Sequence, residues 1–343
     1  MSSSLRLNPG NVYFLRLQDP ETGDHHPYVK IGITHGPVAD RIRQLKTGSP
    51  YSIVEYTSFA SEAAHHVEQM MHRRLQPRRR NLEWFRIEEA ELPDIVAMAR
   101  EYSDTVGERA ERVRELNDTE SDEVMLDPDE RILELQEEVT TLLKDQLTLS
   151  KRLAIGKAGL ALLTARSTGI EGVTKVTITD PEPSFSKAEL KRNHPELHAQ
   201  FKTRPAWSAK FAWLGKPRAT SIPELQAEFN QAEAAVPGVA PDEVQLSERV
   251  PRSDEIVQIH GAWVELTAEL AEVDTQLSLH QLELRDFCGS HKGINGVCTF
   301  VRGPKMEFDE EAFQLAHPDI YEESVTQGRP TRRFAVEKSR NYL

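Results

Sequence analysis

Five residues near the start of the chain have side chains suited to cutting a phosphodiester bond: Tyr13, Lys30, Arg41, Glu68 and His72. Such cleavage requires a group that deprotonates the attacking water, a cation that neutralises the developing negative charge, and a metal ion that holds the phosphate. The carboxylate of Glu68 suits a hard cation such as Mg²⁺. The guanidinium of Arg41 can grip a phosphate oxygen. A tyrosine beside cations can have a lowered pKa and act as a base or proton relay.

Four of these side chains also have a structural interpretation that the sequence leaves open. Tyr13 suits a buried position on a strand, and Arg41 could pair with the neighbouring Asp40. Taken alone, Glu68 would more often be a solvated helix residue, and His72 could serve only to complete a hydrogen-bond network. The order and spacing of the residues within one small domain favour the chemical interpretation.

The elements that must position these residues form a compact unit of strands and helices over residues 10–100. Short apolar runs with β-branched or aromatic residues predict strands, and helical spacing of apolar residues predicts helices. The expected strands are 11–17, 28–33, 52–59 and 84–87, and the expected helices are 39–46, 62–75 and 93–102. Glu68 and His72 are four residues apart on the second of these helices, so they share one helical face.

Short motifs follow one another through this unit. They are Val12-Tyr13, Lys30-Ile31-Gly32-Ile33-Thr34, Arg41, Leu45-Lys46-Thr47-Gly48-Ser49-Pro50, Glu68-Gln69-Met70-Met71-His72 and Glu83-Trp84-Phe85. In this order they resemble the GIY-YIG nuclease superfamily, in the branch known as T5orf172 or MUG113-like domains. The resemblance covers about a quarter of the chain. It implies a small antiparallel sheet flanked by helices, and a site containing Tyr13 and Arg41 with one catalytic Mg²⁺ or Mn²⁺ held by Glu68.

Two positions depart from the wider superfamily. Lys30 replaces the second tyrosine that gives the superfamily its name, as is usual in this branch, and could lower the pKa of Tyr13 or contact the phosphate. Leu45 stands where many members carry a histidine four residues after the arginine. The role of base therefore falls on Tyr13 or His72, and the predicted catalytic set stays Tyr13, Lys30, Arg41, Glu68 and His72.

The charge of the chain is segregated. The net charge is -13, which argues against a protein that coats nucleic acid over its whole surface. The N-terminal unit nevertheless carries basic residues that a nuclease could place against backbone phosphates. The predicted nucleic-acid contacts are Lys46, Arg73, Arg78, Arg79 and Arg80. DNA is the expected partner.

The rest of the chain contains a tandem repeat. Apolar residues alternate in steps of three and four over 132–163 and again over 256–287, at a constant offset of 124 residues. This spacing predicts two long helices with coiled-coil-like seams. Gly169-Ile170-Glu171-Gly172-Val173 matches Gly293-Ile294-Asn295-Gly296-Val297 at the same offset. Because a long amphipathic helix cannot bury its seam alone, the helices are expected to pair within one chain or between the chains of a homodimer.

The predicted fold is therefore an α+β N-terminal domain, a small antiparallel sheet flanked by helices, followed by a duplicated module of a long helix plus a small α/β part. The expected divisions are the nuclease-like domain at 8–102, an acidic linker or solvated helix at 103–126, repeats at 127–215 and 251–343, and a linker at 216–250.

Taken together, the motifs predict a divalent-metal-dependent endonuclease that acts on DNA, with a repeat module for oligomerisation, target sensing or regulation, in phage defence or mobile-element biology. The alternative is a non-catalytic nucleic-acid-binding or scaffold protein with a degenerate nuclease domain. The chain lacks an apolar signal core at residues 1–6 and any membrane-spanning run, and has two cysteines without metal-ligand spacing. These features favour a reducing cytoplasm and no membrane partner.

Overall fold

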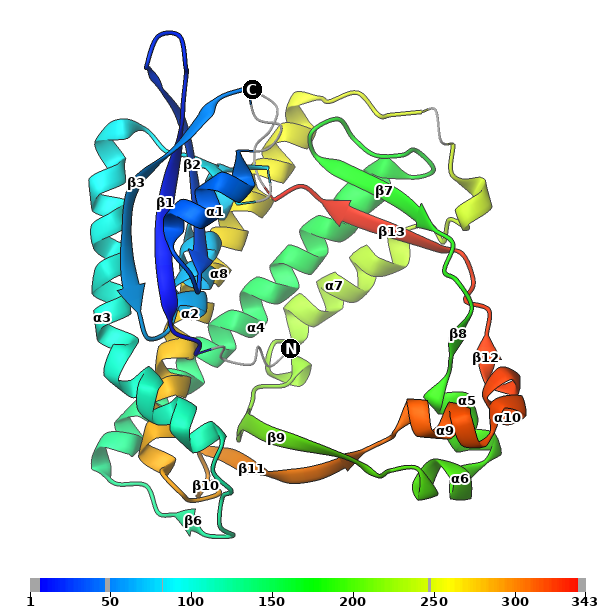
Figure 1. Ribbon diagram of the computed structural model, residues 1–343. Helices are drawn as coiled ribbons and strands as arrows, with labels where there is room; N and C mark the ends of the chain where they lie inside the picture. The colour runs from blue at the N-terminus through cyan, green and yellow to red at the C-terminus, as the bar shows by residue number, and fades with distance from the viewer. Residues whose placement is uncertain (1–6, 47–49, 82, 246–247, 339–343) are drawn as a thin grey trace.

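Figure 1 shows the computed structural model of the chain, which describes residues 7–46, 50–81, 83–245 and 248–338. Residues 47–49 of the predicted Leu45–Pro50 motif lie outside the described residues. The N-terminal domain is packed against one side of a long antiparallel helix pair, and two β-ribbons extend from the other side of this pair. None of the helices described is both long and apolar enough to span a bilayer.

The N-terminal domain is built on a five-stranded sheet in the order β3-β1-β2-β5-β4. All its neighbouring strands are antiparallel. The strands are β1 (Gly10–Gln18), β2 (His25–Thr34), β3 (Ser52–Ser61), β4 (Arg79–Asn81) and β5 (Trp84–Arg86). The helices are α1 (Val38–Leu45), α2 (Ala64–Arg74) and α3 (Leu92–Asn117), with short 3-10 turns at Gln76–Arg78 and Glu89–Glu91. The predicted antiparallel sheet flanked by helices is thus confirmed.

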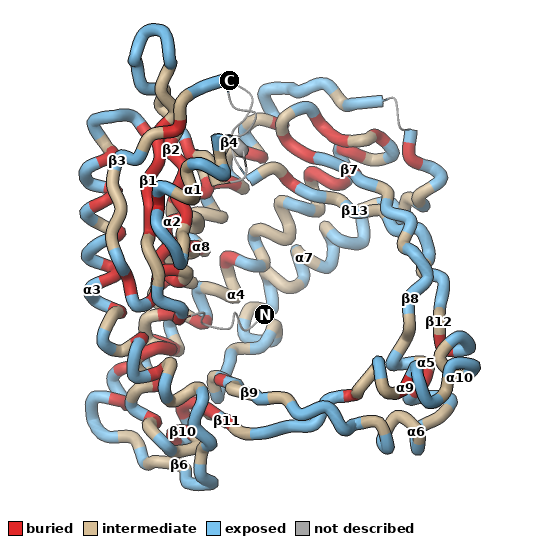
Figure 2. Tube along the Cα trace, in the orientation of Figure 1, coloured by how far each residue is buried: buried red, intermediate tan, exposed pale blue. Residues whose placement is uncertain are grey.

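Alternate residues of a strand point to opposite faces of the sheet, so one strand can contribute to two cores. Val12 and Phe14 pack with α2 and α3 in the larger core. Tyr13 and Leu15 pack with Val38 of α1 in a smaller core on the other face. Figure 2 shows the buried residues concentrated along these strands. The strand that carries Tyr13 is therefore fixed from both sides.

The segment expected as an acidic linker or a solvated helix is helical up to Asn117, as part of α3, but it is not fully solvated. It buries Val106, Ala110 and Val113 in the N-terminal core. Their spacing of four and three residues forms one helical stripe, which charged neighbours had obscured in the sequence. Partly buried Leu279 of α8 packs on the same core, and Arg112 forms a two-bond ion pair with Asp286. The segment is thus part of the N-terminal domain and its attachment to the helix pair.

The two predicted long helices are α4 (Glu130–Thr164) and α8 (Asp254–Cys288), each 35 residues long. They pack against each other within one chain. The start of α4, at Ile132 and Leu135, shares a core with Leu284 near the end of α8. The end of α4, at Leu160, shares another with Ile256 near the start of α8. The pair is therefore antiparallel, and Figure 1 shows it between the N-terminal domain and the β-ribbons.

The strands of the two predicted repeats are exchanged. In the first ribbon, β9 (Arg204–Trp213) pairs with β11 (Cys298–Glu307), so a strand before the second long helix pairs with one after it. In the second ribbon, β7 (Thr174–Thr179) pairs with β13 (Thr331–Val336). Shorter pairs join β8 (Ser184–Phe185) to β12 (Val325–Thr326) and β10 (Gly293–Ile294) to β6 (Met125–Leu126).

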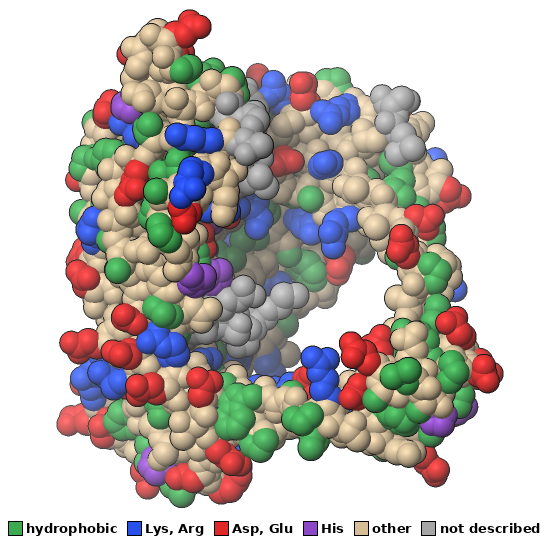
Figure 3. Space-filling model, viewed as in Figure 1, with side chains coloured by type: hydrophobic (Ala, Val, Ile, Leu, Met, Phe, Trp, Pro, Cys, Tyr) green, Lys and Arg blue, Asp and Glu red, His purple; other side chains and the backbone are tan. Residues whose placement is uncertain are grey.

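Small helices close the far end of the two ribbons. They are α5 (Lys187–Asn193), α6 (Pro195–Gln200), α9 (Glu310–Ala316) and α10 (Pro318–Glu323). Leu190, Phe308 and Phe313 form their buried core. Figure 3 shows an opening through the molecule, bounded by the ribbons, this corner and the helix pair.

Helix α7 (Pro223–Ala235) occupies the expected linker at 216–250, where 3-10 turns lie at Ala219–Ser221 and Pro241–Glu243. It lies along α4, where the ammonium of Lys151 sits 3.9 Å from the ring centre of Phe229. The long helices, the Gly-bounded turns and the short helices that end at His194 and His317 recur in the same order on both sides of it. The common origin of the two halves stays an interpretation of the sequence.

Candidate active site

Tyr13 occupies the centre of the β1–β2 hairpin. It lies opposite Gly32 in the register and is 1% exposed. A Cβ atom at Gly32 would stand 2.5 Å from the Tyr13 hydroxyl, so only glycine leaves room for the phenol ring to lie across β2. The glycine of the Lys-Ile-Gly motif is therefore needed because it leaves space for the Tyr13 ring.

Arg41 reaches Tyr13 from α1. Its Nε donates to the Tyr13 hydroxyl at 3.4 Å, and its Nη1 donates to Gln44 at 3.1 Å. Burial raises the pKa of Tyr13 more than the hydrogen bond from Arg41 lowers it. The expected lowering of the Tyr13 pKa is thus not found, because the phenol lies inside the domain. Tyr13 is a neutral hydrogen-bonding group in this arrangement.

Lys30 contacts a residue that the sequence did not single out as chemical. Lys30 is 5% exposed, and its ammonium forms an ion pair with the carboxylate of Glu83. Although burial opposes ionisation of Glu83, this contact holds its pKa below the ordinary value. Glu83 precedes β5, whose pairing with β2 brings Trp84 opposite Lys30. In the sequence, the one feature that pointed to Glu83 was its place in the Glu83-Trp84-Phe85 motif.

Glu68 projects from α2 and is 9% exposed. Burial, followed by the like charge of Glu83, raises its pKa to about 7. The Nδ1 atom of His65 lies 3.3 Å from the Glu68 Oε2, and the backbone N–H of Ile33 also donates to the carboxylate. Lys30 and Arg41 act on the charge of Glu68 as well. The structure therefore brings Glu68, Glu83, Lys30, Arg41 and Tyr13 into one electrostatic neighbourhood.

The donor set at Glu68 fits one weakly chelated Mg²⁺. Mg²⁺ keeps several water ligands and binds through one or two carboxylates together with substrate phosphates. Glu68 supplies one such carboxylate, and the burial that raises its pKa to about 7 would be offset by a bound cation. Among the described residues, no group of three or more histidine, cysteine, aspartate or glutamate side chains is placed to hold a metal by itself. A dedicated protein cage is therefore not the kind of site seen here.

His72 has both ring nitrogens engaged, although it lies close enough to Glu83 and Lys30 for their charges to act on its pKa. Its Nε2 lies 2.8 Å from the backbone oxygen of Ile31, which requires Nε2 to be the donor. Arg79 donates to Nδ1 at 3.2 Å, and the ring packs 5.1 Å from that of Phe85. These contacts are those of a residue that fastens α2 to the sheet. The structure thus favours the structural interpretation of His72, and its predicted catalytic role stays a prediction.

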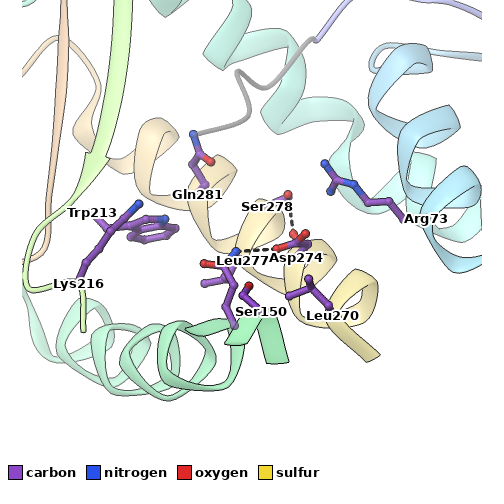
Figure 4. Close-up of a pocket in the computed structure, with 10 residues that line it drawn as sticks. Arg73, Ser150, Trp213, Lys216, Leu270, Asp274, Leu277, Ser278 and Gln281 are labelled. Carbon is purple, nitrogen blue, oxygen red and sulfur yellow. Dashed lines mark hydrogen bonds between the residues drawn. The ribbon is translucent and has the colours of Figure 1, made fainter. Parts of the chain in front are cut away.

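The five predicted nucleic-acid contacts are not brought together. Lys46 is exposed at the end of α1. Arg78 is held in a two-bond ion pair by Glu91, at 2.8 and 2.9 Å. Arg79 packs over Phe85 and contacts His72, and Arg80 lies in β4. Arg73 instead points towards α8 and the helix pair (Figure 4). Lys46 follows the last residue of α1, the helix that also carries Arg41.

The stability of the protein without metal is expected to fall as pH rises from about 4.5 to 7. The pKa of Glu68 is about 7 in the fold against 4.5 ordinarily, so between these values the folded state keeps a proton that the unfolded state releases. Folding then becomes less favourable with rising pH, by roughly 1–2 kcal/mol once partial solvent exposure is allowed for. Thermal melting of wild type and Glu68→Gln in chelator, at pH 5 and pH 8, measures this. Equal pH dependence of the two proteins would refute the assignment.

Comparison with known proteins identifies only the N-terminal part. No curated protein and no solved structure matches the chain. The family model that matches does so over the segment that contains β1 to β5, α1, α2 and the first third of α3. This segment includes Tyr13, Lys30, Arg41, Glu68 and Glu83, and the match agrees with the resemblance carried by the motifs. Residues 10–100 of the chain match the T5orf172 domain.

Proposed function

We propose that the N-terminal domain is a divalent-metal-dependent endonuclease that hydrolyses phosphodiester bonds, in DNA. The observation that carries this proposal is the buried Glu68 carboxylate, whose pKa is raised to about 7 by burial and by the like charge of Glu83. It lies within the electrostatic reach of Tyr13, Arg41 and Lys30. The T5orf172 match over residues 10–100 supports a nuclease-like domain independently.

The residues of the site divide the work by their chemistry. Glu68 would hold the Mg²⁺ or Mn²⁺, which supplies a positive charge for the phosphate and lowers the pKa of a bound water. Arg41 binds a phosphate oxygen, and its long 3.4 Å contact to Tyr13 is weak enough to yield to that ligand. Tyr13 presents its hydroxyl to the reacting group as a hydrogen-bonding and proton-relay group. Lys30 and Glu83 hold each other in place as an ion pair, and both act on Glu68: the charge of Glu83 raises its pKa and that of Lys30 lowers it.

The helix pair is proposed to direct or restrain this activity. Helix α2, which carries Glu68, is tied to α8 by Arg74, whose Nε and Nη2 both donate to the Glu272 carboxylate at 2.7 Å. Arg109 and Arg131 both reach Glu283 of the same helix. A change in the position of α8 would therefore shift α2, the helix that carries Glu68. A role in phage defence or mobile-element biology follows as an extension of this proposal.

Removal of divalent cations is expected to abolish cleavage. Full-length protein is incubated with supercoiled plasmid, single-stranded DNA and RNA, each with Mg²⁺, with Mn²⁺ and with excess chelator. Conversion of plasmid to nicked or linear forms should require either cation, because the isolated Glu68 carboxylate cannot supply the positive charge that the transition state needs. Readdition of cation to the chelated sample is the control for irreversible damage.

The same experiment separates the alternative. Tight binding of DNA in chelator with no cleavage of any substrate under any cation would favour a non-catalytic binding protein and contradict the proposal. Cleavage of RNA alone would keep the chemistry and overturn DNA as the substrate.

A further inference from the structure

A polar cavity lies outside the candidate active site, between the N-terminal domain and the helix pair. Its volume is about 300 Å³. It is bounded by α2, α4, α8 and the end of β9. None of Tyr13, Lys30, Arg41 or Glu68 lines it. This volume is at the lower end of the range for small-molecule sites, which suits a ligand of about one nucleotide.

Two cations face this cavity from opposite sides. Figure 4 shows Arg73 of α2 on one side and Lys216, just after β9, on the other. Among the residues that the structure describes, neither side chain has an ion pair or hydrogen bond, although ion pairs are frequent elsewhere on this acidic chain. Unpaired cations that converge on one cavity indicate an anionic ligand.

Two polar side chains of α8 add directional contacts. Gln281 is buried, 7% exposed, and its Nε2 donor has no partner among the described residues. Burying an amide donor without a partner costs free energy, and a ligand acceptor would remove this cost. The Asp274 carboxylate also lines the cavity and is held by Gln146, whose Nε2 donates at 2.6 Å. Its remaining lone pairs can accept from hydroxyl groups of a ligand.

An aromatic surface completes the set. The indole of Trp213 lies beside Lys216 in the wall of the cavity and is half-buried. It packs edge-on against Phe211, with ring centres 4.8 Å apart, which fixes its orientation. A fixed indole face is a stacking platform for a nucleobase.

We propose that this cavity binds a nucleoside phosphate. Trp213 stacks on the base and Asp274 accepts from the ribose hydroxyls. Arg73 and Lys216 pair with the phosphates, and Gln281 donates to a phosphate or base acceptor. An inorganic anion alone would leave the indole unused and would meet the Asp274 charge, whereas a nucleoside alone would leave both cations unpaired. The mixed character of the cavity therefore favours a ligand that carries all three parts.

The position of Arg73 links this site to the nuclease site. Arg73 is five residues after Glu68 on the same helix α2. A ligand that draws Arg73 towards α8 acts directly on the element that carries the catalytic carboxylate. A nucleotide bound in this cavity would thus act on the helix that carries Glu68, a regulatory role that rests on the proposed function, whereas the binding itself does not.

Isothermal titration calorimetry of the full-length protein with ATP, in chelator, tests the proposal. Saturable binding with one site per chain is expected, with adenosine and inorganic phosphate each about tenfold weaker or more. Lys216→Gln changes an exposed side chain and should weaken ATP binding about tenfold, as should Arg73→Gln. Lys144→Gln, an exposed lysine of α4 outside the cavity, is the matched control and should leave the affinity unchanged. Melting temperatures verify that all variants are folded.

Three outcomes would overturn the proposal. They are the absence of saturable heat with ATP or GTP at millimolar concentration, equal affinity for inorganic phosphate and ATP, and a Lys216→Gln variant that binds as the wild type does. The measurement is independent of cleavage, so failure of the endonuclease proposal leaves its result interpretable.

Discussion

Replacement of Glu68 by glutamine is expected to lower the rate of phosphodiester cleavage by roughly 10³-fold while the protein stays folded. Glutamine keeps the size and hydrogen-bonding atoms of the side chain but cannot balance the charge of a divalent cation. Burial, which raises the pKa of this carboxyl to about 7, makes its ionised form unfavourable to the fold. The same substitution should therefore raise the melting temperature above pH 7 in the absence of metal. Lost activity together with gained stability is typical of a residue kept for function.

The measurement is a time course of plasmid nicking at saturating Mg²⁺ for wild type and Glu68→Gln, paired with melting curves. Glu101→Gln is the matched control, because this exposed glutamate lies on α3 of the same domain, away from the site. It should cleave at the wild-type rate. Cleavage by Glu68→Gln at a rate within about threefold of wild type would remove Glu68 from the mechanism and, with it, the endonuclease assignment.

The local elements of the N-terminal domain could be predicted because their signals are short-range. The alternation of Val12, Tyr13, Phe14 and Leu15 between two cores is a property of one strand. Tyr13, Arg41 and Glu68 could be named from the motifs. Glu83 could not be given a role, because its contact with Lys30 arises only when β5 pairs with a strand more than fifty residues earlier. Such pairings depend on the assembled sheet rather than on neighbouring residues.

The arrangement of the C-terminal part shows the same limit at a larger scale. Seam spacing predicts α4 and α8, but it does not say whether they pair within a chain, and the structure pairs them internally. The exchanged ribbons join strands as far apart as Thr174 and Val336. No local pattern encodes that choice of partner. The glycine turns at Gly169 and Gly293 were local signals in the sequence for the starts of β7 and β11 alone among the four ribbon strands.

Gly169→Ala and Gly293→Ala are each expected to destabilise the helix pair and its ribbons by roughly 2–4 kcal/mol. A methyl group at Gly169 would stand 2.2 Å from the Thr174 backbone oxygen, and one at Gly293 would stand 2.4 Å from that of Cys298. Backbone atoms of paired strands cannot move aside as a flexible side chain can. At Gly169 the φ of 142° adds strain for any other residue. The turn must open, and with it the start of β7 or β11.

Gly159→Ala is the matched control, because it makes the same chemical change inside α4 with nothing within 4 Å of the added methyl. Alanine is the better helix former, so this variant should be more stable than wild type by about 0.5–1 kcal/mol. Thermal and urea unfolding, followed by circular dichroism at one protein concentration, compare the three variants. If Gly169→Ala and Gly293→Ala had the same melting temperature as Gly159→Ala, the close backbone approach at these turns would be refuted. If only one of the two lost stability, the turns would not be equivalent.

Because β11 pairs with β9 across the halves, a loss at Gly293 must also weaken the ribbon that ends at Trp213. The turn glycines thus tie the long helices to both ribbons, which is why two small substitutions are expected to have so large an effect.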